Sequence, residues 1–577
     1  MYIENLPSKN KKHASYVLLR ETTWKNGKSV KKTIANISSW NKQKIEALRL
    51  VLKGNTQVGT SSFEILRSLP HGNTLAVLGT MKHLGLPAII ASKATRVRDI
   101  LLGLIAQRIL SPRSKLATTQ DLHPDTATST LFEELHLSDL KSYDVYDAMD
   151  YLYKHKPEIE KRLAKKHLSG NCLVLYDLTS VFFEGETCPL TFLGHSKDKK
   201  GSLQIVVGLL TNKDGVPIST EVFEGNTLDH QTLVSQINKV RTQYTMKDGI
   251  FVGDRGTIIA KRITEDMKGI AGLSFVTALG AKQVAGLMQE GSLQLSLFDK
   301  ADLAEIKSEL YPDERLICCR NPLLAEERKA KREALLKATE KELDKIVTAV
   351  KREKRPLFDK AQIGLRVGKV INKYKMNKHI IVTIDEGVFS YQRDESSIAK
   401  ESLLDGVYVI RTTVTTEVAD MQKAVTIYKS LANVEKAFRC MKTTDLDIRP
   451  VFHHLPERVK AHVFLCMLAY YVEYHMRESL APILFIDEEK EDQSKRGSVV
   501  AQAIRSNGAK EKDKRKMTPD GYPVQSFRKL LSDLATLTRN TIAPKENETL
   551  TFKKLTNPTL LQKKALDLLK VPLTPAQ

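Results

Sequence analysis

Two aspartates each end a short apolar run in this sequence of 577 residues. Asp177 follows the run CLVLY, and Asp254 follows IFVG. Such runs predict buried strands, and an acid at the carboxyl end of a strand is well placed to point into a crevice beside a sheet. Either acid alone could simply cap a turn. Two acids on consecutive apolar strands favour a shared site.

A third carboxylate, Glu435, lies in a segment with helical spacing. Tyr428, Glu435 and Lys442 follow one another at intervals of seven residues. Each such step drifts only about 20° around a helix, so the spacing predicts that all three share one face of a helix over residues 418–442. A glutamate beside an apolar stripe is costly to bury unless it is paired or bound to a metal. Pairing with Lys436 or Lys442 is the alternative.

Three carboxylates on separate elements predict phosphodiester chemistry. Two-metal cleavage needs ions about 3.5–4 Å apart, one at the attacking oxygen and one at the leaving oxygen. Mg²⁺ prefers hard oxygen ligands and takes one or two carboxylates besides water and phosphate. We therefore expect Asp177, Asp254 and Glu435 to hold two Mg²⁺ ions, with Mn²⁺ as an alternative.

The charge balance favours a polyanionic partner. Lys and Arg number 90 against 68 Asp and Glu, a net charge of +22, which is typical of nucleic-acid binding. A basic protein without that role is the alternative. The six cysteines show no C-x-x-C pair, and no phosphate-binding GKS/T loop occurs, which disfavours structural zinc and ATP hydrolysis. No signal peptide or run of about 20 apolar residues is seen, so we expect a cytoplasmic protein without a membrane partner.

The elements that must position the acids are predicted in six parts. The pattern from residue 172 is three strands, a helix, a strand, a helix and a strand, typical of an α/β fold. The turn Asn26-Gly27 predicts an N-terminal hairpin, and Thr95 is expected to cap a helix. The first part is a β-arm at 1–60. It is followed at 61–168 by a helical domain, which is expected either to bind DNA or to be a plain bundle. A first catalytic part at 169–282 and a second at 406–480 flank an insertion with a Lys-rich helix at 283–405, and a basic, partly mobile C-terminal region covers 481–577.

The glutamate segment resembles a known transposase signature. The run Tyr428-x2-Leu431-x3-Glu435-x6-Lys442 is similar to the Y-(2)-R-(3)-E-(6)-K signature of a large group of bacterial insertion-sequence transposases, with Leu431 in place of the arginine. The segments YDLTSVFFEG, HSKDKKGSLQIVVGLL, VGDRG and VFHHLPERVKAHVFLCMLAYYV resemble the same group. The resemblance covers roughly residues 170–480.

That resemblance implies a fold and an activity. It implies an RNase H-like mixed sheet flanked by helices, with the first acid on the first strand, the second after the fourth strand, and the glutamate on a later helix beyond an insertion domain. Water would first expose a 3′-hydroxyl at each transposon end, and that hydroxyl would then attack target DNA. The implied partners are the terminal inverted repeats, target DNA and a second copy of the chain, in a bacterial cytoplasm at the nucleoid.

The resemblance also implies DNA contacts. Tyr428 and Lys442 would contact phosphates near the cut, Arg255 or Arg439 can substitute for the arginine that Leu431 replaces, and Lys436 belongs to the same basic set. Two other functions stay open: a DNA-binding protein of transposase ancestry without catalysis, and an RNase H-like nuclease without strand transfer.

Several other polar residues are weaker candidates. Asp229 and His230 could position DNA or a metal, although a helix cap is the favoured interpretation of Asp229. The remaining candidates are the alternative acids Glu184 and Glu186, the strand-end residues Glu224 and Asn226, and the histidines His453 and His454.

Overall fold

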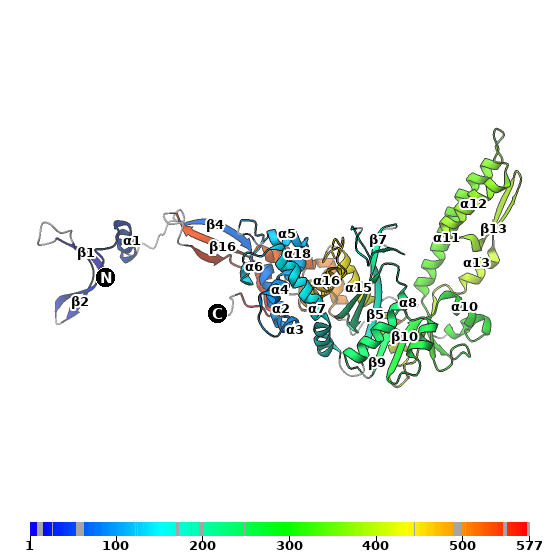
Figure 1. The fold of residues 1–577 in the computed structure, drawn as a ribbon, viewed down its shortest axis with the longest axis horizontal. Helices are drawn as coiled ribbons and strands as arrows, with labels where there is room; N and C mark the ends of the chain where they lie inside the picture. Colours follow the sequence, from blue (N-terminus) through cyan, green and yellow to red (C-terminus); the bar gives the residue numbers. More distant parts are fainter. Residues whose placement is uncertain are drawn as a thin grey trace. The chain divides into compact units, whose positions relative to one another are not determined.

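The structure is a computed structural model with a mixed α/β fold (Figure 1). It describes all residues except 8–15, 26, 54–62, 122, 124, 169–171, 186, 195–200, 247, 300, 444, 490–497, 502, 546–550 and 574–577. The chain divides into two compact units, residues 1–69 with 538–556 and residues 70–537 with 557–577. The six-part division expected from the sequence stays a prediction.

The first unit contains two small antiparallel sheets. Strands β1 (Tyr2–Leu6), β2 (Tyr16–Lys25) and β3 (Lys28–Asn36) form one of them, followed by helix α1 (Lys42–Leu52). This confirms the predicted hairpin of β2 and β3, although Asn26 of its turn lies outside the described residues. Strands β4 (Phe63–Pro70), β16 (Thr538–Pro544) and β17 (Phe552–Leu555) form the other sheet. Residues 63–70 were expected to be helical, but a partner strand from near the chain's end makes them a strand.

The second unit begins with a bundle of helices. These are α2 (Gly72–His83), α3 (Leu86–Ile90), α4 (Arg96–Leu110), α5 (Lys115–Gln120), α6 (Leu131–Glu134) and α7 (Ser142–His167). The Thr95 hydroxyl accepts a hydrogen bond from the Arg98 amide at 3.2 Å, so the predicted cap of α4 is confirmed. Helices α4 and α7 pack against α16 (Pro456–Ser479), which is apolar on nearly every side and therefore buried.

A nine-stranded mixed sheet follows the bundle. Its strands are β5 (Cys172–Phe182), β6 (Phe192–Leu193), β7 (Leu203–Asn212), β8 (Pro217–Glu224), β9 (Gly249–Val252), β10 (Leu273–Ala278), β11 (Leu303–Ile306), β12 (Arg315–Arg320) and β15 (Val407–Thr412). The order is β11-β12-β15-β10-β9-β5-β7-β6, with β8 also paired to β7. The β5–β9 and β9–β10 pairs are parallel, and the other pairs are antiparallel.

The connections within the sheet confirm the predicted alternation. Helix α8 (Asp229–Asn238), extended by the π-helical turn η2 (Lys239–Gln243), joins β8 to β9. The short α9 (Ala260–Arg262) and η3 (Ile263–Met267) join β9 to β10. Strands β11 and β12 were expected to belong to the insertion, yet they extend this sheet because β15 gives them an edge to pair with.

The Lys-rich segment forms a helical arm with its own core. It comprises α11 (Pro322–Val350), α12 (Lys360–Tyr374), β13 (Ile380–Asp385), β14 (Val388–Arg393) and α13 (Glu395–Ser402). Buried side chains of α11 and α12 pack on one another and on Phe389 of β14. The long predicted helix is confirmed. Before the arm lie α10 (Ala281–Glu290) and η4 (Leu295–Phe298), and η5 (Asn377–His379) precedes β13.

The remaining helices complete the second unit. They are α14 (Met421–Lys429), α15 (Leu431–Lys442), η6 (Ala481–Ile483), α17 (Asn507–Arg515), α18 (Phe527–Ala535) and α19 (Leu560–Leu568). Residues 507–515 belong to the basic C-terminal region, and Ser506 caps a helix there by accepting from the Ala509 amide at 3.0 Å. Among the described residues, no helix combines the length and apolar character that crossing a membrane requires.

Candidate active site

The register of two parallel strands brings Asp177 and Asp254 to the same level of the sheet. Leu175 of β5 pairs with Val252 of β9. Each aspartate lies two residues beyond its paired residue, Asp177 within β5 and Asp254 just after β9. Because side chains alternate along a strand, Asp177 continues the face of Leu175. Asp254 follows the end of its strand as expected, whereas β5 continues to Phe182, so the expectation that Asp177 ends its strand is wrong.

The residue before Asp177 shows which face of the sheet this is. The buried hydroxyl of Tyr176 donates to the Thr232 hydroxyl of α8 at 3.0 Å. Asp177 therefore continues the face opposite to the one that Tyr176 and α8 occupy. Helix α15 packs against β5, and Figure 1 shows it across the strand from α8. The first acid and the glutamate helix thus meet on one face of the sheet.

Asp254 holds the turn after β9 with one of its two carboxylate oxygens. Its Oδ1 accepts the backbone amides of Gly256 at 3.0 Å and Thr257 at 2.8 Å. No donor in the described part of the chain bonds to Oδ2. The turn-capping alternative and the metal-binding prediction are therefore compatible. The capping bonds to Oδ1 fix the orientation of the carboxylate, while the lone pairs of Oδ2 can still bind a metal ion.

The helix that bears Glu435 is shorter than expected. Ser430 separates α14 from α15, so Tyr428 and Glu435 lie on different helices, and the expectation of a single helix face is wrong. The Ser430 hydroxyl donates to the Ile427 carbonyl at 2.5 Å, and the Ser430 amide bonds to the same carbonyl at 3.2 Å. These bonds occupy the carbonyl that a continuous helix would have offered to Leu431.

Within α15 the predicted division into two faces is confirmed. Val434 and Phe438 are buried, and Leu431 is half-buried. Glu435, Lys436 and Arg439 are exposed on the other side, and Lys442 at the helix end is half-buried. The basic residues expected to contact DNA therefore share the exposed face of the helix with Glu435.

The Tyr428 phenol is influenced by the charges of both Asp254 and Glu435. Burial raises the pKa of its phenol, and the negative charges of Asp254 and Glu435 raise it further, while the positive charge of Arg255 lowers it. Tyr428 thus lies within electrostatic reach of both acids and of Arg255, even though α14 and α15 are separate. Arg255 is exposed and has no carboxylate partner within 4.0 Å among the described residues.

Asp229 also lies beside Asp254, although the sequence ranked it lower. A Cβ built on Gly256 would lie 3.5 Å from Oδ2 of Asp229 and 3.4 Å from Oδ1 of Asp254. Asp229 is the first residue of α8 rather than its cap, so the favoured interpretation is wrong. Instead, the amide of the preceding Leu228 donates to Gln231 at 3.1 Å. The signal for it in the sequence is its position at the start of the helix that follows β8.

The other candidates lie at the margins. Glu184 and Glu224 are exposed, and Glu186 lies outside the described residues. Burial lowers the pKa of His453 to about 4, so its imidazole is neutral at physiological pH. His454 is hydrogen-bonded through Nδ1 to the Thr187 hydroxyl at 2.6 Å.

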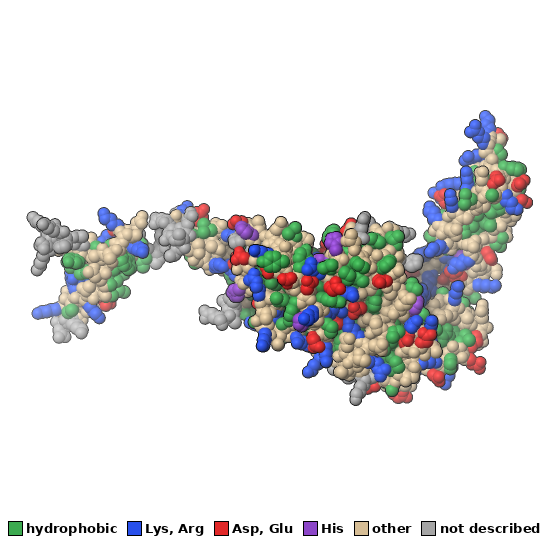
Figure 2. All heavy atoms as spheres, viewed as in Figure 1, with side chains coloured by type: hydrophobic (Ala, Val, Ile, Leu, Met, Phe, Trp, Pro, Cys, Tyr) green, Lys and Arg blue, Asp and Glu red, His purple; other side chains and the backbone are tan. Residues whose placement is uncertain are grey.

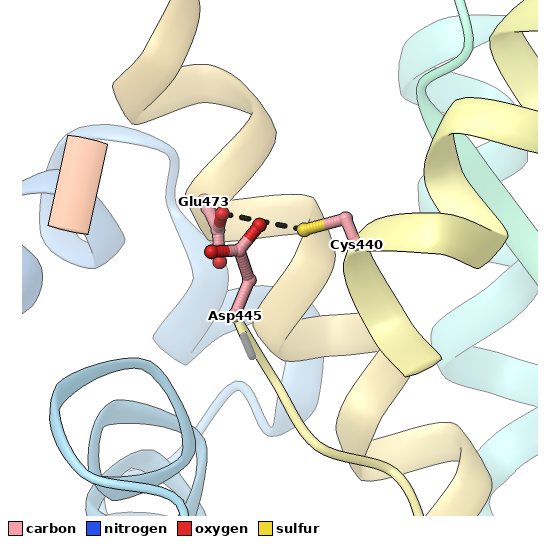
Figure 3. Close-up of side chains that lie close together, drawn as sticks. All are labelled: Cys440, Asp445 and Glu473. Carbon is pink, nitrogen blue, oxygen red and sulfur yellow. Dashed lines mark hydrogen bonds between the residues drawn. The ribbon is translucent and has the colours of Figure 1, made fainter. Parts of the chain in front are cut away.

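A second group of ligand-type side chains is more compact than the first. Cys440, Asp445 and Glu473 place ligand atoms within 4.8 Å of one another (Figure 3), and no other group in the described part of the chain does so. The Cys440 thiol donates to Glu473, and Arg477 bonds to Glu473 at 2.7 Å and to Asp445 at 3.0 Å. Arg477 and Arg528, which lies 3.3 Å from Asp445, already compensate the charge of these acids, so the group is an internal ion network.

The predicted acids fit a two-metal site better than this compact group does. Asp177, Asp254 and Glu435 supply only carboxylate oxygens, the hard donors that Mg²⁺ and Mn²⁺ prefer. Two ions about 3.5–4 Å apart do not require all three carboxylates to touch, because each ion takes a subset of the ligands. The donor set is therefore suited to divalent cations.

One comparison with known proteins identifies the family of the chain. A family model described as "Transposase DDE domain" matches residues 171–472, just over half of the chain. The chain belongs to the DDE transposase family. The matched span runs from the residue before β5 into α16 and includes Asp177, Asp254 and Glu435.

Other comparisons add little to the family match. No curated protein matches the chain. Among solved structures, a chain of a piggyBac transposase synaptic complex with hairpin DNA is similar at 10% identity and a TM-score of 0.25, covering 77% of this transposase chain and 86% of its own. At that TM-score the likeness carries no argument about fold.

Proposed function

We propose that this chain cuts DNA at transposon ends and transfers the resulting 3′-hydroxyl ends to target DNA by two-metal catalysis. The observation that carries the proposal is the β5–β9 register, in which Asp177 and Asp254 each lie two residues beyond the paired Leu175 and Val252. The charges of Asp254 and Glu435 both raise the pKa of Tyr428, which supports including the glutamate in the same site. The family match supports a transposase, and the acid positions support the chemistry.

An RNase H-like core is part of the proposal. Strands β8, β7 and β5 are successively antiparallel, and β9 and β10 continue parallel to β5. This order agrees with the fold that the sequence resemblance implies. The first acid then lies on the first strand and the second after the fourth, as that fold requires.

Asp177, Asp254 and Glu435 would hold the two Mg²⁺ ions. When bound, the ions activate the attacking oxygen and stabilise the leaving oxygen of an in-line displacement. The two backbone amides on Asp254 Oδ1 keep that carboxylate in a fixed orientation before any substrate arrives. Such preorganisation lowers the cost of assembling the site during the reaction.

Tyr428 would act as a hydrogen-bond donor to a phosphate. Because its pKa is raised above the usual value of 10.0, the phenol stays protonated at physiological pH. A protonated phenol donates to a phosphate oxygen without adding negative charge beside the acids. Leu431 offers no such contact, and the exposed Arg255 and Arg439 supply the positive charge that the family arginine would bring.

The partners in this proposal are the two transposon ends, target DNA and a second copy of the chain. Pairing two ends requires two active sites, which is the reason for proposing a homodimer. The bacterial cytoplasm, at the nucleoid, is the proposed location. The net charge of +22 supports association with DNA but selects no sequence.

Cleavage of the DNA that flanks the gene tests the proposal. Purified wild type with Mg²⁺ is expected to nick that DNA at its inverted repeats and to join it to a target plasmid. Asp177→Ala, Asp254→Ala and Glu435→Ala are expected to lose both activities. Glu395→Ala, which removes an exposed acid in the helical arm, is the matched control.

Three results would change the conclusion. Single acid variants that cut as well as wild type would overturn the site. A wild type that binds the ends but never nicks them would support the inactive DNA-binding alternative. Nicking without joined products would support the nuclease alternative.

A further inference from the structure

The two long helices of the arm carry very different charge. Helix α11 has seven basic and six acidic residues, whereas α12 has four basic residues and no acidic one. On α11 the charges pair along the helix, as in Lys337 with Glu333 at 3.7 Å and Lys345 with Glu342 at 2.6 Å. The charges of α11 therefore nearly cancel, whereas α12 keeps an uncompensated positive charge.

The positive charge continues into the segments on either side of α12. Residues 351–378 contain ten Lys and Arg against two acids, and all ten basic residues are exposed. Lys360 pairs with Asp385 at 3.3 Å, and Lys378 pairs with Glu401. The other eight have no carboxylate within 4.0 Å among the described residues. They are Lys351, Arg352, Lys354, Arg355, Arg366, Lys369, Lys373 and Lys375.

Three of these eight form a row along α12. Ile363, Val367 and Ile371 turn one side of the helix into the core of the arm. Arg366, Lys369 and Lys373 lie on a different side, and seven residues of helix extend roughly 10 Å. In Figure 2, Lys and Arg side chains also gather at the tip of the arm.

The row of positive charges on α12 does not stabilise the arm. Like charges three or four residues apart on a helix destabilise it by about 0.2–0.5 kcal/mol per pair, and Lys369 and Lys373 are such a pair. An external polyanion would offset this repulsion. Duplex DNA carries a negative charge about every 1.7 Å along its axis, so a row about 10 Å long can face several phosphates.

We propose that the α12 row (Arg366, Lys369 and Lys373), with the 351–355 connection, is a docking surface for the phosphate backbone of duplex DNA. The inference rests on the proposed function, because DNA is the polyanion that a transposase holds. The contact is independent of sequence, since Lys and Arg would meet phosphates rather than base edges. It gives the arm a role in holding DNA besides the contacts at the carboxylates.

Salt-dependent binding of a mixed-sequence DNA duplex tests this surface in the full chain. The test variant is R366Q/K369Q/K373Q. The matched control is K337Q/K341Q/K345Q, which removes the same charge from the balanced helix α11 of the same arm. The slope of log K against log salt should become shallower by roughly 2 to 3 for the α12 variant, about 0.9 for each lost phosphate contact, and by less than one for the control.

A second variant protects the test against a folding defect. K351Q/R352Q/K354Q lies in the connection between the helices, where no regular helix can be broken, and is expected to weaken binding in the same direction. Circular dichroism should show wild-type helix content for all three variants. Equal slope changes for the α12 and α11 variants, or none for the α12 and 351–354 variants, would overturn the proposal.

The outcome also separates this surface from the proposed chemistry. If the α12 variant loses affinity for RNA duplexes but not for DNA, DNA is the wrong polyanion. If wild type binds mixed-sequence DNA through α12 yet never cleaves end DNA, the docking surface stands and the proposed function fails. If Glu435-dependent cleavage occurs and the α12 variant binds DNA as wild type does, the docking surface fails alone.

Discussion

The helix α15 borders two groups of acids that differ in what neutralises them. On its exposed side lies Glu435, whose negative charge, like that of Asp254, raises the pKa of Tyr428. On its buried side, Cys440 contacts Glu473, which is fully buried and bonded to Arg477. Basic residues lie around the Glu435 group, whereas in the Cys440 group Arg477 is bonded directly to the acids. Compactness alone therefore does not identify a cation site.

The difference follows from the cost of burying charge. A carboxylate out of water needs a partner of opposite charge or several donors. The protein provides that partner permanently for Glu473 and Asp445 through Arg477, with Arg528 also 3.3 Å from Asp445. Asp254 instead keeps one oxygen on backbone amides. The group of Asp254 and Glu435 can therefore still bind a cation from solution.

The largest expected effect is on catalysis at the exposed group. Glu435→Gln should reduce end cleavage by roughly 10³-fold, about 4 kcal/mol in activation free energy, because the amide is a far weaker metal ligand. As the side chain is exposed, the free energy of unfolding should change by less than about 0.5 kcal/mol. Single-turnover cleavage and urea unfolding measure the two quantities. A variant that loses stability and activity together would erase the contrast between the groups.

The next effect is on stability at the buried group. Arg477→Met should lower the free energy of unfolding by about 3 kcal/mol, since it leaves the buried Glu473 without its cation. Adding Glu473→Gln to that variant should recover part of the loss, because the unpaired charge disappears. Urea unfolding of both variants gives the comparison. A loss below about 0.5 kcal/mol for Arg477→Met would show that the network is not needed.

Metal binding should stabilise the protein through the exposed group only. Mg²⁺ at 100 times its dissociation constant stabilises a folded protein by about 2.7 kcal/mol. We expect thermal unfolding to show this gain for wild type and Glu473→Gln, and a much smaller gain for Asp254→Asn. If Glu473→Gln abolished the gain while Asp254→Asn kept it, the Cys440 group would be the cation site.

The smallest expected effect is a pH dependence of the buried group. Burial raises the pKa of Glu473 above its usual value of 4.5, against the opposing pull of Arg477. In the unfolded chain this carboxyl ionises first, so wild type should lose stability relative to Glu473→Gln as pH rises above about 4.5, until the folded carboxyl ionises too. Urea unfolding of both proteins across that range measures the difference. A difference that stays constant with pH would contradict the raised pKa.

Much of the catalytic sheet could be predicted from local patterns. The runs before Asp177 and Asp254 are apolar because their strands are buried, and Asp254 marks where β9 ends, whereas β5 continues beyond Asp177. The long helix α11 and the two faces of α15 follow from spacing in the same way. These features depend on which side of one element is buried, and a sequence shows that directly.

The failures have two physical causes. The break at Ser430 is local: it depends on which nearby carbonyl a hydroxyl bonds, and the residues around it are compatible with a continuous helix. Strand β4 exists because β16 pairs with it from a distant part of the chain. Asp229 lies near Asp254 because the first residue of α8 lies beside the turn after β9. The last two outcomes are decided by contacts between segments that no local pattern relates.

By itself, the sequence determined the order of strands and helices along the sheet and the excess of positive charge, and it singled out three acids as candidates. Only the tertiary structure decided which carboxylates are already neutralised. Arg477 lies 32 residues from Asp445 in the chain, yet it bonds to it and to Glu473 at once. Charge is a property of residue type, whereas its compensation depends on distances of a few ångströms between side chains, and those distances are set when the chain packs.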